Sequence, residues 1–262
     1  MTFQFTEQHR DEYFSAGLTT LRGIIPPSLL SALRRETDKA RAIARERGGP
    51  QSQRLQPVYR YEELNHRHFR DFLELAGMQA TVEGILGAGH ETADNMGVLL
   101  EPAEQAWCTN WHRDVAHHIP GLDNEWFFQT AANLQTFNQF NAALYDDHSL
   151  WLVPGSHHRQ DTPEERACFP QMPPAAPSLR EQMLPEERER ACLEYAQAMP
   201  GAEPVVLFAG DCAFYRASGW HLGNYVPYLK RATLHDNFQG EDDRVWWEGV
   251  RQMRAATRQQ AG

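Results

Sequence analysis

The chain has 262 residues, 41% of them hydrophobic, which is enough for one domain with a sizeable core. Its 35 acidic and 25 basic residues give a formal net charge of −10, which argues against nucleic acid or an anionic membrane as the main partner. The first residues show no signal-peptide pattern, and no run approaches the roughly 18 apolar residues of a membrane-spanning helix. The four cysteines lack the paired spacing of a zinc ribbon or a redox dithiol. We therefore expect a soluble cytoplasmic protein with a single domain over residues 1–262.

Residues 1–90 have the pattern of a helical layer. Thr6 is suited to the N-cap of a first helix, and Gly17 can adopt the left-handed conformation that ends it. Further on, apolar residues recur at the spacing of a helix with one buried face. The predicted elements are a helix between Thr6 and Gly17, a strand over 18–25, and helices over 28–47, 69–75 and 79–86.

Residues 95–240 change to a pattern of short strands. Short apolar or mixed runs are separated by Gly, Pro, Asn and Asp, which favour turns. The expected architecture is a β-rich core packed against the N-terminal helices, mainly β with α. The predicted strands lie at 96–101, 107–115, 126–141, 150–153, 205–208, 212–216 and 231–238.

A proline-rich insertion, residues 159–204, interrupts these strands. It holds eight prolines and one charged segment, 186–198, that has the composition of a helix. A connection of this length without strands is uncommon unless it forms a lid, a binding loop or a linker. We expect a lid.

The tetrapeptide Trp111-His-Arg-Asp114 carries the first chemical signal. In an extended segment side chains alternate between faces, so His112 and Asp114 point to one side and Arg113 to the other. Together with His221 they would form two imidazoles and one carboxylate, the donor set of non-haem Fe(II) oxygenases. Either residue of the triplet could instead hydrogen-bond a loop. A protein-kinase catalytic loop, which also contains His-Arg-Asp, is excluded because the accompanying Asn and the Asp-Phe-Gly motif are missing.

A candidate anion anchor, Arg231, follows His221 by ten residues. Its guanidinium could bind the far carboxylate of a dicarboxylic cosubstrate through two parallel hydrogen bonds. Thr233, on the same face of a strand, could add a hydroxyl. A surface salt bridge is the alternative role for Arg231, and Lys230 competes for the anchoring role.

These features together resemble the phytanoyl-CoA dioxygenase family of Fe(II)/2-oxoglutarate-dependent oxygenases. The order and spacing of the matching landmarks cover nearly the whole chain. They are Thr6-Glu-Gln before a helix, Gly17, Pro26-Pro27 before a long helix, His112-Arg-Asp114, Leu152-Val-Pro-Gly-Ser-His157, Gly210-Asp211 before a strand, and His221 with Arg231.

The resemblance implies a double-stranded β-helix, the jelly-roll or cupin-like fold, with Fe(II) in its mouth. It implies that His112, Asp114 and His221 bind the iron, that Arg231 anchors 2-oxoglutarate, and that Trp126 lies near this cosubstrate. With O2, such enzymes oxidise a substrate while 2-oxoglutarate becomes succinate and CO2. The carboxylate at Asp114 disfavours the halogenating variant and favours hydroxylation or a related oxidation.

The departures from the family concern the loops. Asp146-Asp-His-Ser149 replaces an Asn-Gly turn, and Gly223 stands where some members carry a hydroxyl. The substrate class is open, although five tryptophans near the motifs favour a small, partly apolar metabolite unless they only pack in the core. Arg159, Arg166 and Arg180 leave an acyl-CoA pocket open. A cupin-like metalloenzyme that does not use 2-oxoglutarate and a non-catalytic metabolite-binding protein remain alternatives.

Overall fold

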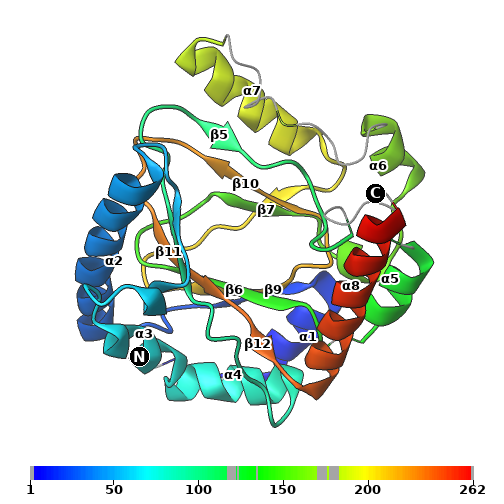
Figure 1. The fold of residues 1–262 in the computed structure, drawn as a ribbon, viewed down its shortest axis with the longest axis horizontal. Helices are drawn as coiled ribbons and strands as arrows, with labels where there is room; N and C mark the ends of the chain where they lie inside the picture. Colours follow the sequence, from blue (N-terminus) through cyan, green and yellow to red (C-terminus); the bar gives the residue numbers. More distant parts are fainter. Residues whose placement is uncertain are drawn as a thin grey trace.

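Two antiparallel sheets form the centre of the molecule, and helices cover their outer sides (Figure 1). The computed structural model describes residues 3–116, 122, 124–133, 135–169, 176 and 183–260. The larger sheet has the strand order β1-β9-β6-β11-β4-β2, and the smaller sheet has the order β5-β10-β7-β8. The pattern of short strands predicted a β-rich core, and the resemblance to the dioxygenase family implied the two-sheet arrangement.

The strands of both sheets are short, as the spacing of turn residues predicts. The larger sheet consists of Leu18–Leu21 (β1), Arg54–Leu55 (β2), Gly97–Leu100 (β4), Asn138–Ala143 (β6), Cys212–Arg216 (β9) and Ala232–Asp236 (β11). The smaller sheet consists of Trp107–Cys108 (β5), Leu150–Leu152 (β7), Glu203–Pro204 (β8) and His221–Tyr225 (β10). Glu91–Thr92 (β3) pairs with Phe238–Gln239 (β12).

Four α-helices cover the larger sheet, at the positions that the sequence predicts (Figure 1). They are Glu7–Ala16 (α1), Pro27–Gly48 (α2), His66–Leu73 (α3) and Ala76–Leu86 (α4), with a 3-10 turn at Val58–Arg60 (η1). Thr6 is the N-cap of α1, and Gly17 ends it with φ 80° in the left-handed region. Buried side chains such as Leu33, Phe72 and Phe140 join these helices to the sheet in one apolar core.

The run 126–141, predicted to be one strand, is instead a helix followed by a strand. Asn124–Ala131 (α5) precedes β6. Phe127 and Ala131 are four residues apart, so a helix places both on one buried face. They pack against Trp246 and Val250 of the C-terminal helix Glu241–Gln260 (α8). The helical conformation of α5 is stabilised by this contact with α8, which is distant in the sequence, so the local pattern alone does not indicate it.

The predicted insertion contains two helices, Pro163–Cys168 (α6) and Pro185–Ala198 (α7). α7 confirms the helix predicted at 186–198 and lies against the smaller sheet (Figure 1). Most of the segment between them, 170–175 and 177–182, lies outside the described residues. The central part of the predicted lid therefore also lies outside them. The strand predicted at 205–208 is reduced to one bridge between Leu207 and Asp147.

None of the described helices is long and apolar enough to cross a membrane.

Candidate metal centre

The two histidines of the predicted site are paired across adjacent segments. The backbone N–H of each donates to the carbonyl of the other, at 3.1 Å from His112 and 3.0 Å from His221. His221 is the first residue of β10, and His112 lies shortly after β5, which pairs with β10. The ring centroids are consequently 4.2 Å apart. Strand pairing therefore brings together two residues that are 109 positions apart in the sequence.

Asp114 completes a compact donor set. Its Oδ1 lies 3.5 Å from Nε2 of His112 and 3.8 Å from Nε2 of His221. One ligand atom from each of the three side chains lies within 4.8 Å of the others, close enough to share one metal ion. Within the described part of the chain, no other group of His, Cys, Asp and Glu side chains has this geometry.

The hydrogen bonds of the two imidazoles use Nδ1 and leave Nε2 of each ring available to a metal. Nδ1 of His112 lies 2.7 Å from the carbonyl of Asn110, and Nδ1 of His221 lies 3.0 Å from the carbonyl of Gly219. Because a carbonyl only accepts, Nδ1 carries the proton in both rings and Nε2 carries the lone pair. Burial, together with the neighbouring His221, lowers the pKa of His112 to about 4. Neutral imidazoles and one carboxylate are a donor set that fits Fe(II).

A chain of hydrogen bonds orients the Asp114 carboxylate. The hydroxyl of Tyr215 donates to Oε1 of Gln139 at 2.8 Å, so the amide nitrogen of Gln139 must face Asp114. That nitrogen donates to Oδ2 of Asp114 at 2.5 Å, while Oδ1 faces the two histidines. Sequence reasoning missed both supporting residues. Gln139 and Tyr215 are opposite one another on β6 and β9, so only the strand register reveals them.

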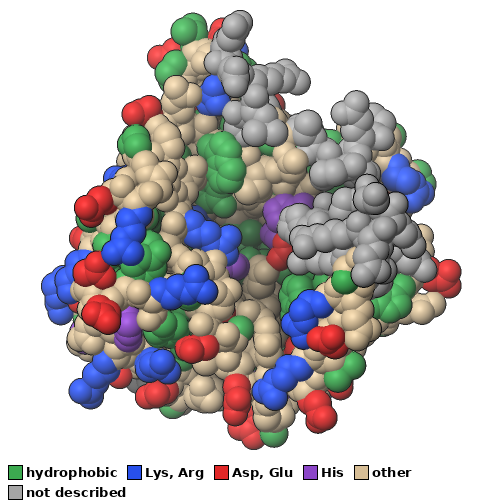
Figure 2. Space-filling view, viewed as in Figure 1, with side chains coloured by type: hydrophobic (Ala, Val, Ile, Leu, Met, Phe, Trp, Pro, Cys, Tyr) green, Lys and Arg blue, Asp and Glu red, His purple; other side chains and the backbone are tan. Residues whose placement is uncertain are grey.

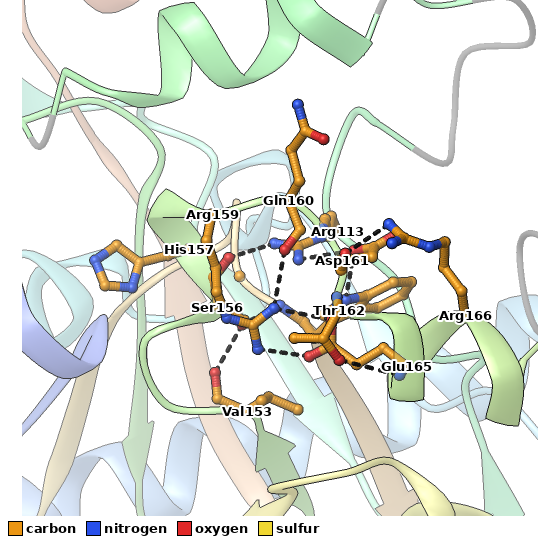
Figure 3. Close-up of polar contacts among 12 residues, drawn as sticks. Arg113, Val153, Ser156, His157, Arg159, Gln160, Asp161, Thr162, Glu165 and Arg166 are labelled. Carbon is orange, nitrogen blue, oxygen red and sulfur yellow. Dashed lines mark hydrogen bonds and ion pairs between the residues drawn. The ribbon is translucent and has the colours of Figure 1, made fainter.

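Arg113 does not line the cavity that His112 and Asp114 line, in agreement with the predicted alternation. Figure 3 shows its guanidinium among Ser156 and Asp161. Arg113 is 2% exposed and donates to the carbonyls of Ser156 and Ser218 at 2.6 and 2.9 Å. Its guanidinium also pairs with Asp161 at 3.0 Å, and the indole N–H of Trp220 donates to the same carboxylate oxygen at 2.9 Å. Asp161 therefore links the residue between the first two ligands to the residue before His221.

Trp111 connects the site to α7. Its backbone N–H donates to the hydroxyl of Tyr195 at 3.0 Å, and its indole N–H donates to the carbonyl of the same residue at 3.2 Å. Trp111, Trp151 and Trp220 are buried in one apolar cluster. For these three tryptophans, core packing is the correct interpretation.

The donor set lines a cavity of about 480 Å³ between the two sheets. Figure 2 views the molecule onto a hollow in which histidine and acidic side chains are visible beside basic ones. The wall includes residues of both sheets and of α8. Besides the three donors it includes Leu99, Thr109, Asn141, Tyr225, Arg231, His235, Trp246 and Trp247.

Arg231 lines the same cavity and is held by Asp147. Its Nε donates to Oδ2 of Asp147 at 2.8 Å, and both side chains are less than one tenth exposed. Burial alone would raise the pKa of Asp147, but Arg231 and the hydroxyls of Ser149 and Thr233 lower it to about 2. The terminal nitrogens of Arg231 have no hydrogen-bond partner among the described residues. The pair is therefore a buried one, and the surface salt bridge considered as the alternative is wrong.

The structure gives partners for three further residues named in the sequence analysis. The hydroxyl of Thr233 donates to Asp147 at 2.6 Å, so it supports the carboxylate that holds Arg231. Trp126 stacks on Trp246 at 5.9 Å and does not line the cavity, whereas Trp246 does. Lys230 pairs with Asp38 at 2.9 Å on the surface. The tryptophans that line the cavity are Trp107 of β5 and Trp246 and Trp247 of α8.

The fold is similar to that of solved structures, although no protein-family model and no curated protein matches the sequence. AviO1 from Streptomyces viridochromogenes Tue57 superposes with a TM-score of 0.60 at 14% identity, over 92% of this chain and 97% of that one. EctD from S. alaskensis, solved with 2-oxoglutarate and 5-hydroxyectoine, gives a TM-score of 0.58 at 13% identity, over 91% and 77%. SnoK, a non-haem α-ketoglutarate-dependent carbocyclase from nogalamycin biosynthesis, gives 0.55 at 12% identity, over 90% and 84%. These likenesses confirm the predicted double-stranded β-helix.

Proposed function

We propose that the protein is an Fe(II)- and 2-oxoglutarate-dependent oxygenase that hydroxylates or otherwise oxidises a small-molecule metabolite. The observation that carries this proposal is the shared cavity of a His112, Asp114 and His221 donor set and the buried Arg231. EctD, which has the same fold, was solved with 2-oxoglutarate in one structure and with iron in another. The ordered landmarks of the phytanoyl-CoA dioxygenase family add support for a member of that group.

The donor residues and Arg231 have separate roles in this proposal. The two imidazoles and Oδ1 of Asp114 would hold Fe(II), the ion that this donor set suits. The terminal nitrogens of Arg231 bind the far carboxylate of 2-oxoglutarate. When bound, iron couples the decarboxylation of 2-oxoglutarate by O2, with release of succinate and CO2, to oxidation of the substrate. Trp246 and the walls of both sheets keep water away from the reacting atoms.

Asp114 supports oxygen transfer rather than halogenation. Its carboxylate faces both histidines and therefore occupies the position that a halide would need. Arg231 favours the use of 2-oxoglutarate over the alternative of a cupin-like enzyme without it. A buried guanidinium that lines the cavity and has only its Nε bound to Asp147 fits a carboxylate ligand.

The first test is binding and turnover of 2-oxoglutarate. Under anaerobic conditions, Fe(II) with 2-oxoglutarate should give a visible charge-transfer band, and in air the wild type should release succinate. His112→Ala should lose both signals, because the metal loses one of three ligands. The matched control is His148→Ala, an exposed histidine of a nearby loop, which should retain both. Equal succinate from the wild type and His112→Ala would rule out the oxygenase.

The second test separates the alternatives. Arg231→Lys retains a cation for Asp147 but loses the planar pair of donors, so the KM for 2-oxoglutarate should rise roughly 10- to 100-fold. Unchanged turnover in this variant would favour a metalloenzyme that does not use 2-oxoglutarate. Absence of the band in the wild type would favour a non-catalytic binding protein.

A further inference from the structure

The metal cavity continues into a second cavity of about 570 Å³. Neither the three donors nor Arg231 line this second cavity. A molecule bound in the second cavity would therefore not compete with 2-oxoglutarate for Arg231. The residues that border both cavities are Arg54, Gln139, His235, Asn237 and Trp247.

Arg54 lies on the inner face of the larger sheet, at the edge strand β2. In the register of the sheet, Arg54 is opposite Leu99, and Leu99 is opposite Thr233. Opposite residues share a face, so Arg54 and Arg231 both belong to the face that the cavity uses. Strand β4 lies between them. The cavity is therefore lined by two arginines on different strands, an exposed Arg54 and a buried Arg231.

The two arginines differ in their partners. Arg231 is neutralised by Asp147, whereas Arg54 has no carboxylate within 4.0 Å and no side-chain hydrogen bond among the described residues. Other arginines beside the sheet, such as Arg41 and Arg45, are bound by Glu101. A guanidinium without a counter-ion at the border of a cavity is suited to an anionic ligand.

The groups around Arg54 are polar and almost all neutral. His235 has Nδ1 2.9 Å from Oδ1 of Asn141, and burial followed by the charge of Arg54 lowers its pKa to about 3. The Asp236 carboxylate accepts from the backbone N–H groups of Asn95 and Asn237, but burial outweighs these bonds and raises the pKa of Asp236 to about 6. The remaining lining consists of amides and one indole, from Gln56, Asn95, Gln139, Asn237 and Trp247.

No aliphatic side chain is among the described residues of the second cavity. A long alkyl chain would lose its water there without gaining apolar contacts, so this lining disfavours a fatty acyl substrate. Amide groups instead suit hydroxyl, amino and carboxylate groups. Of the three arginines that leave an acyl-CoA pocket open, Arg159 pairs with Glu165 and Arg166 donates to the carbonyl of Asp161. Arg180 lies outside the described residues.

We propose that the primary substrate is a small hydrophilic carboxylate, bound through its carboxylate by Arg54 with the oxidised carbon directed toward the metal. This inference rests on the proposed function and specifies its substrate class. A single unpaired guanidinium matches a monoanion better than a phosphate dianion, which needs more than one donor group of this kind. The inference replaces the partly apolar metabolite expected from the tryptophans, most of which pack in the core.

The test is a substrate screen that compares wild type with Arg54→Gln. Substrate-dependent succinate is measured with α-amino and α-hydroxy acids, each paired with its primary amide, and with phosphate monoesters and fatty acids. The best compound should be a carboxylate whose amide is much poorer, and Arg54→Gln should lower its kcat/KM roughly 10- to 100-fold. Calorimetric binding of that compound to the metal-free protein should weaken by a similar factor. Arg60→Gln, an exposed arginine that lines neither cavity, is the matched control.

The outcomes separate this inference from the proposed function. In Arg54→Gln the anaerobic Fe(II)/2-oxoglutarate band and the KM for 2-oxoglutarate should stay as in the wild type. A raised KM for 2-oxoglutarate in this variant would make Arg54 a cosubstrate contact and overturn the inference. So would an amide, a phosphate ester or a fatty acid as the best substrate, or equal kcat/KM in the two proteins. Absence of the band in the wild type would instead defeat the proposed function.

Discussion

Asp147 shows how one side chain in a loop fixes a buried arginine at the wall of the cavity. It accepts from Arg231, Thr233 and Ser149, so both of its oxygens are satisfied inside the protein. A buried ion pair is costly to break on one side only, because the remaining charge loses both water and partner. Asp147 balances the charge of Arg231 and fixes its guanidinium at the cavity wall.

We expect Asp147→Asn to lower the free energy of unfolding by about 3 to 5 kcal/mol at neutral pH. The folded pKa of about 2 is below the ordinary value of 3.8, so the charged carboxylate stabilises the fold above about pH 4. This contribution, about 2 kcal/mol, is lost as the pH falls from about 4 to 2. Urea unfolding of the wild type should therefore weaken more steeply in this range than that of Asp147→Asn.

The neighbouring Asp146 provides the control for this prediction. It is exposed and accepts only the backbone N–H of Ala209 in the described structure, at 2.9 Å. Asp146→Asn retains an acceptor for that bond, so its unfolding should follow the wild type at each pH. Parallel pH profiles of the wild type and Asp147→Asn would show that the pair does not contribute in the way described.

At the scale of elements, α1 and the Pro-Gly-Ser-His turn form one packed unit. The N–H of Gly155 donates to the carbonyl of Ala16 at 2.8 Å, and the N–H of Arg216 donates to the carbonyl of Gly17 at 2.8 Å. A Cβ on Gly17 would lie 2.5 Å from Nδ1 of His157. The turn therefore needs a glycine at the end of α1 for two separate reasons, the positive φ and the lack of space.

Two glycine substitutions separate these reasons. Gly17→Ala and Gly23→Ala both place alanine at positive φ, 80° and 62°, which costs about 1 to 2 kcal/mol each. Gly23 has nothing within 4 Å of an added Cβ, so it measures backbone strain alone. Gly17→Ala should be further destabilised by about 1 to 3 kcal/mol through the contact with His157. Equal losses of unfolding free energy would mean that the ring moves aside without cost.

At the scale of the whole molecule, the donor set ties the two sheets together. His221 belongs to the smaller sheet, while Gln139 and Tyr215, which hold Asp114, belong to the larger one. A metal ion that binds this set favours the folded state, since unfolded chains do not offer the three ligands together. The stability of the protein should therefore depend on the metal concentration.

We expect Mn(II), a redox-stable substitute for Fe(II), to raise the free energy of unfolding by about 3 kcal/mol at a concentration 100 times its Kd. Chelation should reverse the effect, because the linkage is an equilibrium. Asp114→Ala should abolish the increase, and His148→Ala should retain it. The measurement is thermal unfolding of the wild type, Asp114→Ala and His148→Ala, each with and without Mn(II). An increase in stability that persists in Asp114→Ala would mean that the ion binds elsewhere.

Several parts of this structure could be predicted because their signals are local. The limits of α1 follow from Thr6 and Gly17, and the strand at Cys212–Arg216 follows from an apolar run between turns. The sequence around Asp147 does not indicate its ion pair, because its partner, Arg231, is 84 residues away. Arg54 belongs to a two-residue strand that no local pattern indicates, because this strand is defined only by its pairing with β4.

The sequence by itself determined the helical layer, most of the strands and the identity of the three donor residues, because helix caps, side-chain periodicity and short motifs act over a few residues. The tertiary structure decided how these parts are used. Strand register placed Gln139 and Tyr215 behind Asp114, and helix packing brought Trp246 rather than Trp126 to the cavity. Hydrogen-bond partners and cavity walls join residues that are distant along the chain, so their contacts form only when the two sheets close around them.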